Sequence, residues 1–238
     1  MKLLNKAGFT IIETMLFLGI TALLVMGVLV GTGTSINIQR YRDSVSSLQS
    51  VLQQQFSEVS NVSNDSLSNA CYGDSSANNP RGQSNCVILG RLITTTDSHT
   101  LSIKSVIGYI PSDSSVALND VDTLKQYNIQ ISPVTGETYE IEWGSSLTKP
   151  GGNIAMVFSM LILRSPSSGI VRTFINTDSV VANNAVATLI NQTALTTPAK
   201  MCVDSNGLFT GARTAVEVMA NATSASGVET LEEATSGC

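Results

Sequence analysis

The feature that most constrains this chain is a long apolar run near its N-terminus. A short basic head with Lys2 and Lys6 precedes it, and the run from Phe9 to Val30 contains one charged residue, Glu13. A helix that crosses a hydrocarbon core of about 30 Å needs roughly 20 residues, so this run is long enough. A carboxylate inside such a span costs about 2.5 kcal/mol or more, and a simple membrane anchor gains nothing from it.

The small residue Gly8 precedes the apolar run, and this order differs from that of an ordinary signal peptide. A signal peptide has an apolar region of about 7 to 15 residues, followed by a cleavage site at small residues. Here Gly8 lies between the basic head and the apolar run. Cleavage after Gly8 would leave the apolar helix on the mature chain, with a new α-amino group at Phe9, close to Glu13.

The segment Lys6-Ala-Gly-Phe-Thr-Ile-Ile-Glu13 closely resembles the processing site of type IV prepilins and type II secretion pseudopilins. In that family a membrane peptidase cuts after the glycine and methylates the new N-terminus, and the fifth mature residue is glutamate. The resemblance implies a leader peptide at 1–8, cleavage after Gly8, N-methylation of Phe9 and an assembly role for Glu13. In a helix bundle, Glu13 could pair with the Phe9 ammonium of a neighbouring subunit, which makes a buried charge tolerable. The alternative is a one-pass anchor with a stray glutamate.

Composition narrows the possible functions of the remaining chain. Its 238 residues suffice for this helix and one globular domain. A formal charge of −5 argues against a general nucleic-acid binder. The motifs GxxxxGK[ST], GxGxxG and GxSxG are absent, so we expect no enzyme and no nucleotide or other cofactor. The single histidine, His99, lies in a polar hairpin tip and is expected to be a solvated loop residue.

The four cysteines have no CxxC spacing, so no metal site is expected. An exported domain lies in an oxidising compartment, where disulfides persist. Three pairings are possible, and unpaired thiols are the alternative. We favour Cys71–Cys86, which closes a loop after the helix, and Cys202–Cys238, which ties the chain end to a strand.

The helix is predicted to extend from Phe9 to about Asn61, with its transmembrane part at about 9–30. Apolar residues spaced by three or four positions lie on one face of its second half and predict packing against a domain. The segment Gly31–Ser35 combines two glycines with three β-hydroxy residues, which predicts a bend or a locally melted segment. A continuous helix kept intact by packing is the alternative. The apolar face comprises Tyr41, Val45, Leu48, Leu52, Phe56 and Val59.

Residues 62–238 are predicted to form a β-rich head that begins with a polar loop at 62–86, in the position of the αβ-loop of pilins. Ile154–Leu163 is apolar on both faces and suits a central strand. Two hairpins are predicted: Val87–Thr95 with Leu101–Ile110, and Gln126–Ile131 with Thr138–Trp143. Asp178–Thr193 is expected to be a short helix or a loop. Further strands are expected at Ile170–Ile175, Ala199–Val203, Thr214–Met219 and Val228–Leu231.

The end of the head carries a second resemblance. Cys202–Phe209 followed by Arg213–Val218 resembles a strand–turn–strand near the end of the pseudopilin H and FimT-type minor pilin domain. This favours a β-sandwich-like head over the single antiparallel sheet of major pilins. Asn119–Asp122 and Asp204–Gly207 are interpreted as turns rather than calcium sites. Single solvated charges, rather than a patch, are expected at Arg164, Arg172 and Arg213.

These observations predict an α+β protein with a long N-terminal helix packed on an antiparallel β-rich head. The resemblance implies a structural subunit of a type IV pilus or pilus-like filament that serves adhesion, twitching motility, DNA uptake or secretion. The alternative is a minor pilin or pseudopilin that primes the tip or binds a ligand or DNA there. The implied partners are other copies and other pilins, the prepilin peptidase, and DNA or a surface ligand. The implied location is the cytoplasmic membrane before assembly and the cell surface afterwards.

Overall fold

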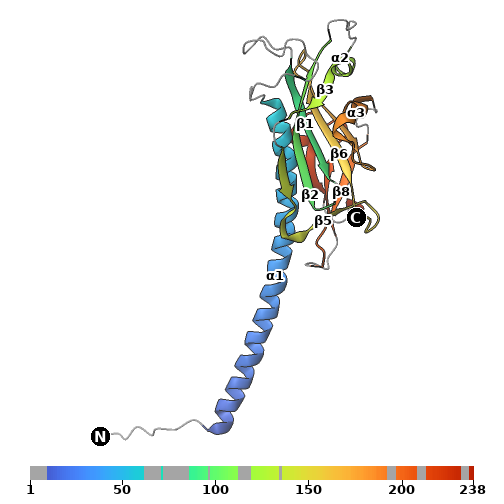
Figure 1. Ribbon diagram of the computed structural model, residues 1–238. Helices are drawn as coiled ribbons and strands as arrows, with labels where there is room; N and C mark the ends of the chain where they lie inside the picture. The colour runs from blue at the N-terminus through green and yellow to red at the C-terminus, as the bar shows by residue number, and fades with distance from the viewer. Residues whose placement is uncertain are drawn as a thin grey trace, which may run out of the picture. The chain divides into compact units, whose positions relative to one another are not determined.

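The chain has the predicted α+β layout, with one long N-terminal helix followed by an antiparallel β domain (Figure 1). The structure is a computed structural model that describes residues 10–61, 71, 86–95, 97–111, 119–133, 136–191, 197–207, 213–231 and 236–238. The chain divides into two compact units, Met1–Arg40 and Tyr41–Cys238. The second unit, hereafter the head, therefore includes the last part of the helix.

Helix α1 spans Ile11–Ser60, and its part within the head is amphipathic as predicted. Leu48, Leu52 and Phe56 are fully buried there. Their spacing of four residues keeps them on one face of the helix, which packs on the sheets. The complete buried set is Tyr41, Ser44, Val45, Leu48, Leu52, Gln55, Phe56 and Val59.

Helix α1 is continuous through Gly31–Ser35, so of the two alternatives the continuous helix is confirmed and the locally melted segment is wrong. Thr32 Oγ1 donates to the Leu29 carbonyl at 3.0 Å, and Thr34 Oγ1 donates to the Val30 carbonyl at 3.2 Å. The hydroxyls thus bond within the helix instead of favouring another backbone conformation. The glycines cost about 1 kcal/mol each in helix propensity.

The larger of the two sheets in the head has six strands, in the order β3-β2-β1-β6-β7, with β4 also on β2. The predicted first hairpin, β1 with β2, is confirmed. The central position of β6 between β1 and β7 is confirmed as well. The strands span Val87–Thr95 (β1), Thr100–Tyr109 (β2), Asn128–Ile131 (β3), Glu137–Glu140 (β4), Phe158–Arg164 (β6) and Val171–Asn176 (β7).

The predicted second hairpin is wrong, because β3 and β4 do not pair with each other. Both pair with β2, β3 along Val106–Tyr109 and β4 along Thr100–Ile103. Strand β2 is long enough for two short strands to lie end to end along its edge. The segment before β3 is helical, since α2 spans Asp120–Gln126 and takes up the first residue of the predicted strand.

The second sheet has four antiparallel strands in the order β10-β9-β8-β5. Two sheets therefore build the head, as the β-sandwich-like interpretation predicts and the single-sheet alternative does not. The strands span Ser146–Thr148 (β5), Ala199–Asp204 (β8), Thr214–Val218 (β9) and Val228–Leu231 (β10).

Two hydrophobic clusters cover the two faces of the larger sheet. One contains the buried face of α1 together with residues of both sheets. The other lies on the opposite face, where α2 contributes Leu124, and α3 (Ala187–Asn191) contributes Leu189. Strand β6 contributes to both: Ile162 belongs to the first cluster and Leu161 to the second. Successive side chains of a strand point to opposite faces, which explains why Met160–Leu163 of this strand are all apolar.

Candidate functional site

The first turn of α1 contains Glu13, the one charged residue of the apolar run. The Glu13 backbone N–H donates to Thr10 Oγ1 at 3.3 Å, so Thr10 caps the helix start. The sequence Thr10-Ile-Ile-Glu13 fits the capping-box pattern, a signal that our sequence interpretation did not use. The predicted cleavage site, Gly8 and Phe9, lies outside the described residues. Cleavage, methylation and the pairing of Glu13 with Phe9 therefore remain predictions.

The helix that follows Glu13 exposes apolar side chains on every face. Met15 is 70% exposed, Leu23 is 73% exposed and Val30 is 67% exposed. Within the described part of the chain, α1 is the one helix whose length and composition would allow it to cross a membrane. A surface of this kind requires a cover, which can be lipid or other protein.

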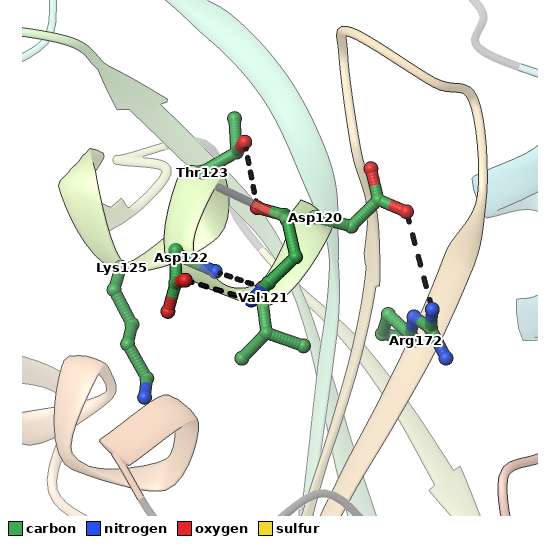
Figure 2. A pocket seen from close by; sticks show the side chains of 7 residues that line it. Asp120, Val121, Asp122, Thr123, Lys125 and Arg172 are labelled. Carbon is green, nitrogen blue, oxygen red and sulfur yellow. Dashed lines mark hydrogen bonds and ion pairs between the residues drawn. The ribbon is translucent and has the colours of Figure 1, made fainter. Parts of the chain in front are cut away.

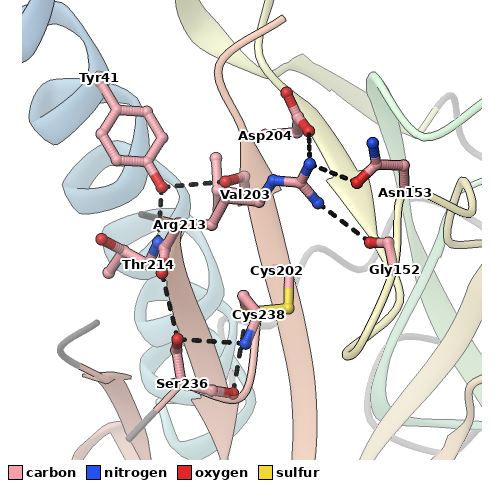
Figure 3. Close-up of a disulfide and its surroundings, with 10 residues drawn as sticks. All are labelled: Tyr41, Gly152, Asn153, Cys202, Val203, Asp204, Arg213, Thr214, Ser236 and Cys238. Carbon is pink, nitrogen blue, oxygen red and sulfur yellow. Dashed lines mark hydrogen bonds and ion pairs between the residues drawn. A yellow bond between two sulfur atoms is a disulfide. The ribbon is translucent and has the colours of Figure 1, made fainter. Parts of the chain in front are cut away.

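The cysteines form the two favoured disulfides, Cys71–Cys86 and Cys202–Cys238. Cys71 and Cys202 are both buried. A disulfide in a small exported domain typically contributes about 2–4 kcal/mol, largely by restricting the unfolded chain. The second disulfide fastens the C-terminal residue to β8, within the second sheet (Figure 3).

Tyr41 of α1 bridges β8 and β9 at the end of their ladder (Figure 3). Its hydroxyl donates to the Val203 carbonyl at 2.9 Å and accepts from the Thr214 backbone N–H at 2.6 Å. Tyr41 is only 4% exposed, so water does not replace these bonds. Sequence periodicity predicted that this residue is buried but not that its hydroxyl is a polar bridge.

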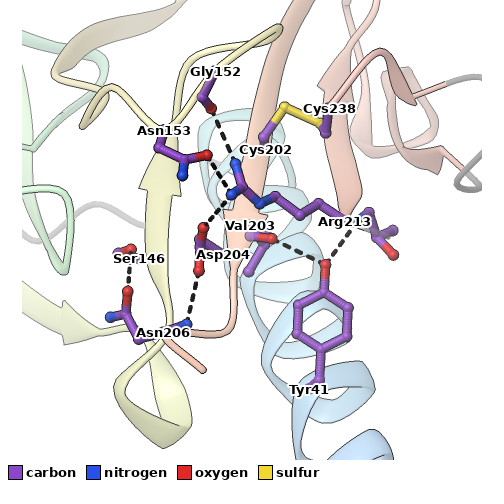
Figure 4. Close-up of polar contacts among 11 residues, drawn as sticks. Tyr41, Ser146, Gly152, Asn153, Cys202, Val203, Asp204, Asn206, Arg213 and Cys238 are labelled. Carbon is purple, nitrogen blue, oxygen red and sulfur yellow. Dashed lines mark hydrogen bonds and ion pairs between the residues drawn. A yellow bond between two sulfur atoms is a disulfide. The ribbon is translucent and has the colours of Figure 1, made fainter. Parts of the chain in front are cut away.

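Next to this bridge, Arg213 joins three segments that are distant in sequence (Figure 4). Its guanidinium pairs with Asp204 at 2.9 Å, donates to the Gly152 carbonyl at 3.0 Å and also contacts Asn153 Oδ1. The Arg213 carbonyl accepts from Ser236 Oγ at 3.1 Å, which brings the chain end into the same network. The interpretation of Arg213 as a solvated charge is therefore wrong.

Replacing Tyr41 with phenylalanine is expected to lower the free energy of unfolding of the head by about 1–3 kcal/mol. The substitution leaves a buried carbonyl and a partly buried N–H without their partner. Tyr109→Phe is the matched control, because the Tyr109 hydroxyl accepts only an exposed hydrogen bond, from Asn128 Nδ2. Denaturant unfolding of the purified protein measures both changes, and equal effects would contradict the bridging role.

His99 is half-buried and bonded, which corrects its interpretation as a solvated loop residue. Its Nδ1 lies 3.1 Å from the Ser145 carbonyl. Asp97 does not bond the imidazole but accepts backbone N–H bonds from His99 at 3.0 Å and Thr100 at 2.7 Å. Partial burial raises the pKa of Asp97, but these bonds outweigh it and hold the pKa below its usual value. Asp97 thus stabilises the turn that leads into β2.

A hollow of about 750 Å³ lies beside α2 and β7 (Figure 2). Its lining includes Lys125 from α2 and Arg172 from β7. The Arg172 guanidinium lies 3.9 Å from Asp120, which is longer than a hydrogen bond. Arg172 Nε is buried, and no described residue accepts a hydrogen bond from it. The lining also includes the carboxylates Asp120 and Asp122, so two acidic and two basic side chains balance in formal charge.

Asn119–Asp122 and Asp204–Gly207 are the two segments interpreted as turns. Their side-chain oxygens accept hydrogen bonds from other groups of the protein. Asn119 caps α2, and its Oδ1 accepts from the Asp122 N–H at 2.9 Å. Asp204 accepts from the Asn206 N–H at 2.8 Å and also pairs with Arg213. Among the described residues, no cluster of histidine, cysteine and acidic side chains suits a metal ion.

Comparison of the chain with protein-family models, with curated proteins and with solved structures found no match.

Proposed function

We propose that this protein is a structural subunit of a type IV pilus or a related pilus-like filament. The observation that carries the proposal is one carboxylate, Glu13, in the first turn of a helix whose large apolar side chains are exposed as far as Val30. Among the described residues, no side chain donates to that carboxylate. A second copy of the chain would supply both an apolar cover for the helix and a cation for Glu13.

Helix capping alone does not account for the acid. Glu13 lies close to the helix N-terminus, where a carboxylate contributes about 0.3–1 kcal/mol. Placing the same carboxylate in a hydrocarbon environment costs about 2.5 kcal/mol or more. Because the cost exceeds the benefit, the acid requires another partner, and the α-amino group of a processed Phe9 is the nearest candidate in the sequence.

The experiment that tests the proposal is mass spectrometry of the mature N-terminus in filaments sheared from cells. We expect a chain that begins at N-methylated Phe9. The matched control is Gly8→Leu, which should retain Met1 and be missing from the filaments. A chain that keeps its first eight residues and never occurs in filaments would refute the proposal. The amount of protein in the sheared fraction distinguishes a major subunit, which dominates it, from a tip protein, which is scarce.

A further inference from the structure

The chain contains one Asn-Gly dipeptide, Asn206–Gly207, in the turn that follows β8. Asparagine before glycine is a reactive arrangement for deamidation, because glycine neither shields its own backbone nitrogen nor restrains the backbone. Both residues are exposed to water. Sequence and solvent access thus permit the reaction, so the conformation of the turn decides whether it occurs.

Deamidation begins when the backbone nitrogen of Gly207 attacks Cγ of the Asn206 side chain. The new C–N bond closes a five-membered succinimide ring, the Cγ–Nδ2 bond breaks, and the proton lost by the Gly207 nitrogen leaves with the ammonia. Water then opens the ring at either carbonyl and produces aspartate or isoaspartate at position 206. The reaction needs no enzyme, but the side chain has to fold back onto the Gly207 nitrogen.

The Asn206 side chain is instead bonded at both ends to another segment of the head (Figure 4). Its Nδ2 donates to the Gly144 carbonyl at 2.6 Å, and its Oδ1 accepts from Ser146 Oγ at 3.3 Å. The Asn206 backbone N–H donates to Asp204 Oδ1 at 2.8 Å, which fixes the main chain as well. Both side-chain bonds have to break before Cγ can reach the Gly207 nitrogen.

The bond to Gly144 closes one end of the second sheet. Strand β5 has three residues, and its ladder with β8 ends at the pair of Ser146 with Asp204. Asn206 lies two residues beyond that pair on one strand, and Gly144 lies two residues beyond it on the other. The Asn206 side chain therefore continues the ladder past its last backbone pair.

Deamidation would remove this closure. A carbonyl oxygen can only accept a hydrogen bond, so the Asn206 atom that faces Gly144 has to be nitrogen. Aspartate at position 206 would place an acceptor where the donor was, and its charge would lie close to Asp204. Isoaspartate would in addition lengthen the backbone of the turn by one atom.

We infer that Asn206–Gly207 is a deamidation site that the folded head protects, and that the reaction releases the Gly144 turn irreversibly. While the two side-chain bonds persist, asparagine persists. Each opening of the turn exposes Cγ to attack, and after conversion the donor that closed the turn is lost. The site thus records local opening of the head in one direction, and this inference does not depend on the proposed filament function.

Peptide mapping by mass spectrometry of the purified full chain in detergent tests the protection. We expect Asn206 to deamidate about tenfold more slowly in the folded chain than in a reduced and alkylated chain in guanidinium chloride, at the same pH and temperature. Equal rates at Asn206 in the two states would overturn the inference.

Asn221–Ala222 is the matched control in the same peptide map. Asn221 is exposed and has a positive φ of 55°, as Asn206 has one of 49°, but alanine follows it instead of glycine. In the unfolded chain we expect Asn206 to react much faster than Asn221. Equal rates at these two positions would show that the dipeptide is not a reactive site and would also overturn the inference.

Two substitutions test the contacts themselves. Ser146→Ala removes one of the two side-chain bonds and should speed deamidation at Asn206 in the folded chain about threefold. Asn206→Asp reproduces the product and should lower the guanidinium chloride midpoint of the head, whereas Asn221→Asp should not. An unchanged rate in the first variant, or equal midpoints of the two aspartate variants, would contradict the closing role of the Asn206 side chain.

Discussion

Glu13→Ala is expected to abolish filament assembly while the chain still enters the membrane. The substitution makes the apolar run more hydrophobic, so insertion does not weaken. In the proposed filament it would remove the partner of a buried ammonium, a loss that would cost about 3–5 kcal/mol. A loss of about 3 kcal/mol lowers an association constant roughly a hundredfold, and it recurs at every subunit added. The measurement is the amount of the protein in sheared filaments relative to the amount in the membrane fraction.

Glu13→Gln separates charge from shape in the same position. Glutamine retains the size and hydrogen-bonding capacity of the side chain but lacks its negative charge, so we expect it to fail like alanine. Filaments at the wild-type level from either variant would contradict the pairing of Glu13 with a neighbouring N-terminus. Both variants should still be cleaved after Gly8. That cleavage would show that membrane insertion and processing by the peptidase are normal.

Elements with a local periodic signal could be predicted from the sequence. The head-packed part of α1 repeats apolar residues at intervals of three and four, and Leu48, Leu52 and Phe56 are buried as this repeat predicts. Residues Met160–Leu163 of strand β6 are a continuous apolar run, which is typical of a strand that is covered on both faces. In both cases the pattern within one segment already specifies which side chains are buried.

Features that depend on distant segments could not be predicted in this way. Strands β3 and β4 have the hairpin pattern, but the open edge of the longer β2 accepts both of them. The Tyr41 bridge likewise depends on partners from other parts of the chain. No pattern in the sequence around Trp143 indicates its positive φ of 57°. The bulge in β1 is an exception, because the sequence contains a signal for it. Gly90 is an isolated glycine inside a strand pattern, and such a glycine indicates a bulge or a close backbone approach.

Gly90→Ala is expected to destabilise the head by about 3 kcal/mol or more, because the site leaves no room for a methyl group. The β1–β2 register shifts between Ile88 and Gly90, which marks a bulge in β1. A Cβ atom at Gly90 would lie 1.8 Å from the Ile162 carbonyl oxygen of β6. The obstacle is backbone at the centre of the larger sheet, which no side-chain rotation removes. The β1–β6 pairing would therefore have to shift. This shift would also displace β6, which contributes to both hydrophobic clusters.

Gly152→Ala is the matched control for this substitution. A Cβ atom there meets no heavy atom closer than 4.0 Å, and its φ is not in the left-handed region. Because alanine also restricts the unfolded chain, we expect a change within about 1 kcal/mol. Denaturant unfolding of both variants, followed by circular dichroism, measures the difference. Equal stability of the two variants would mean that β1 and β6 do not approach as closely as described. It would also contradict the central position of β6, on which both clusters depend.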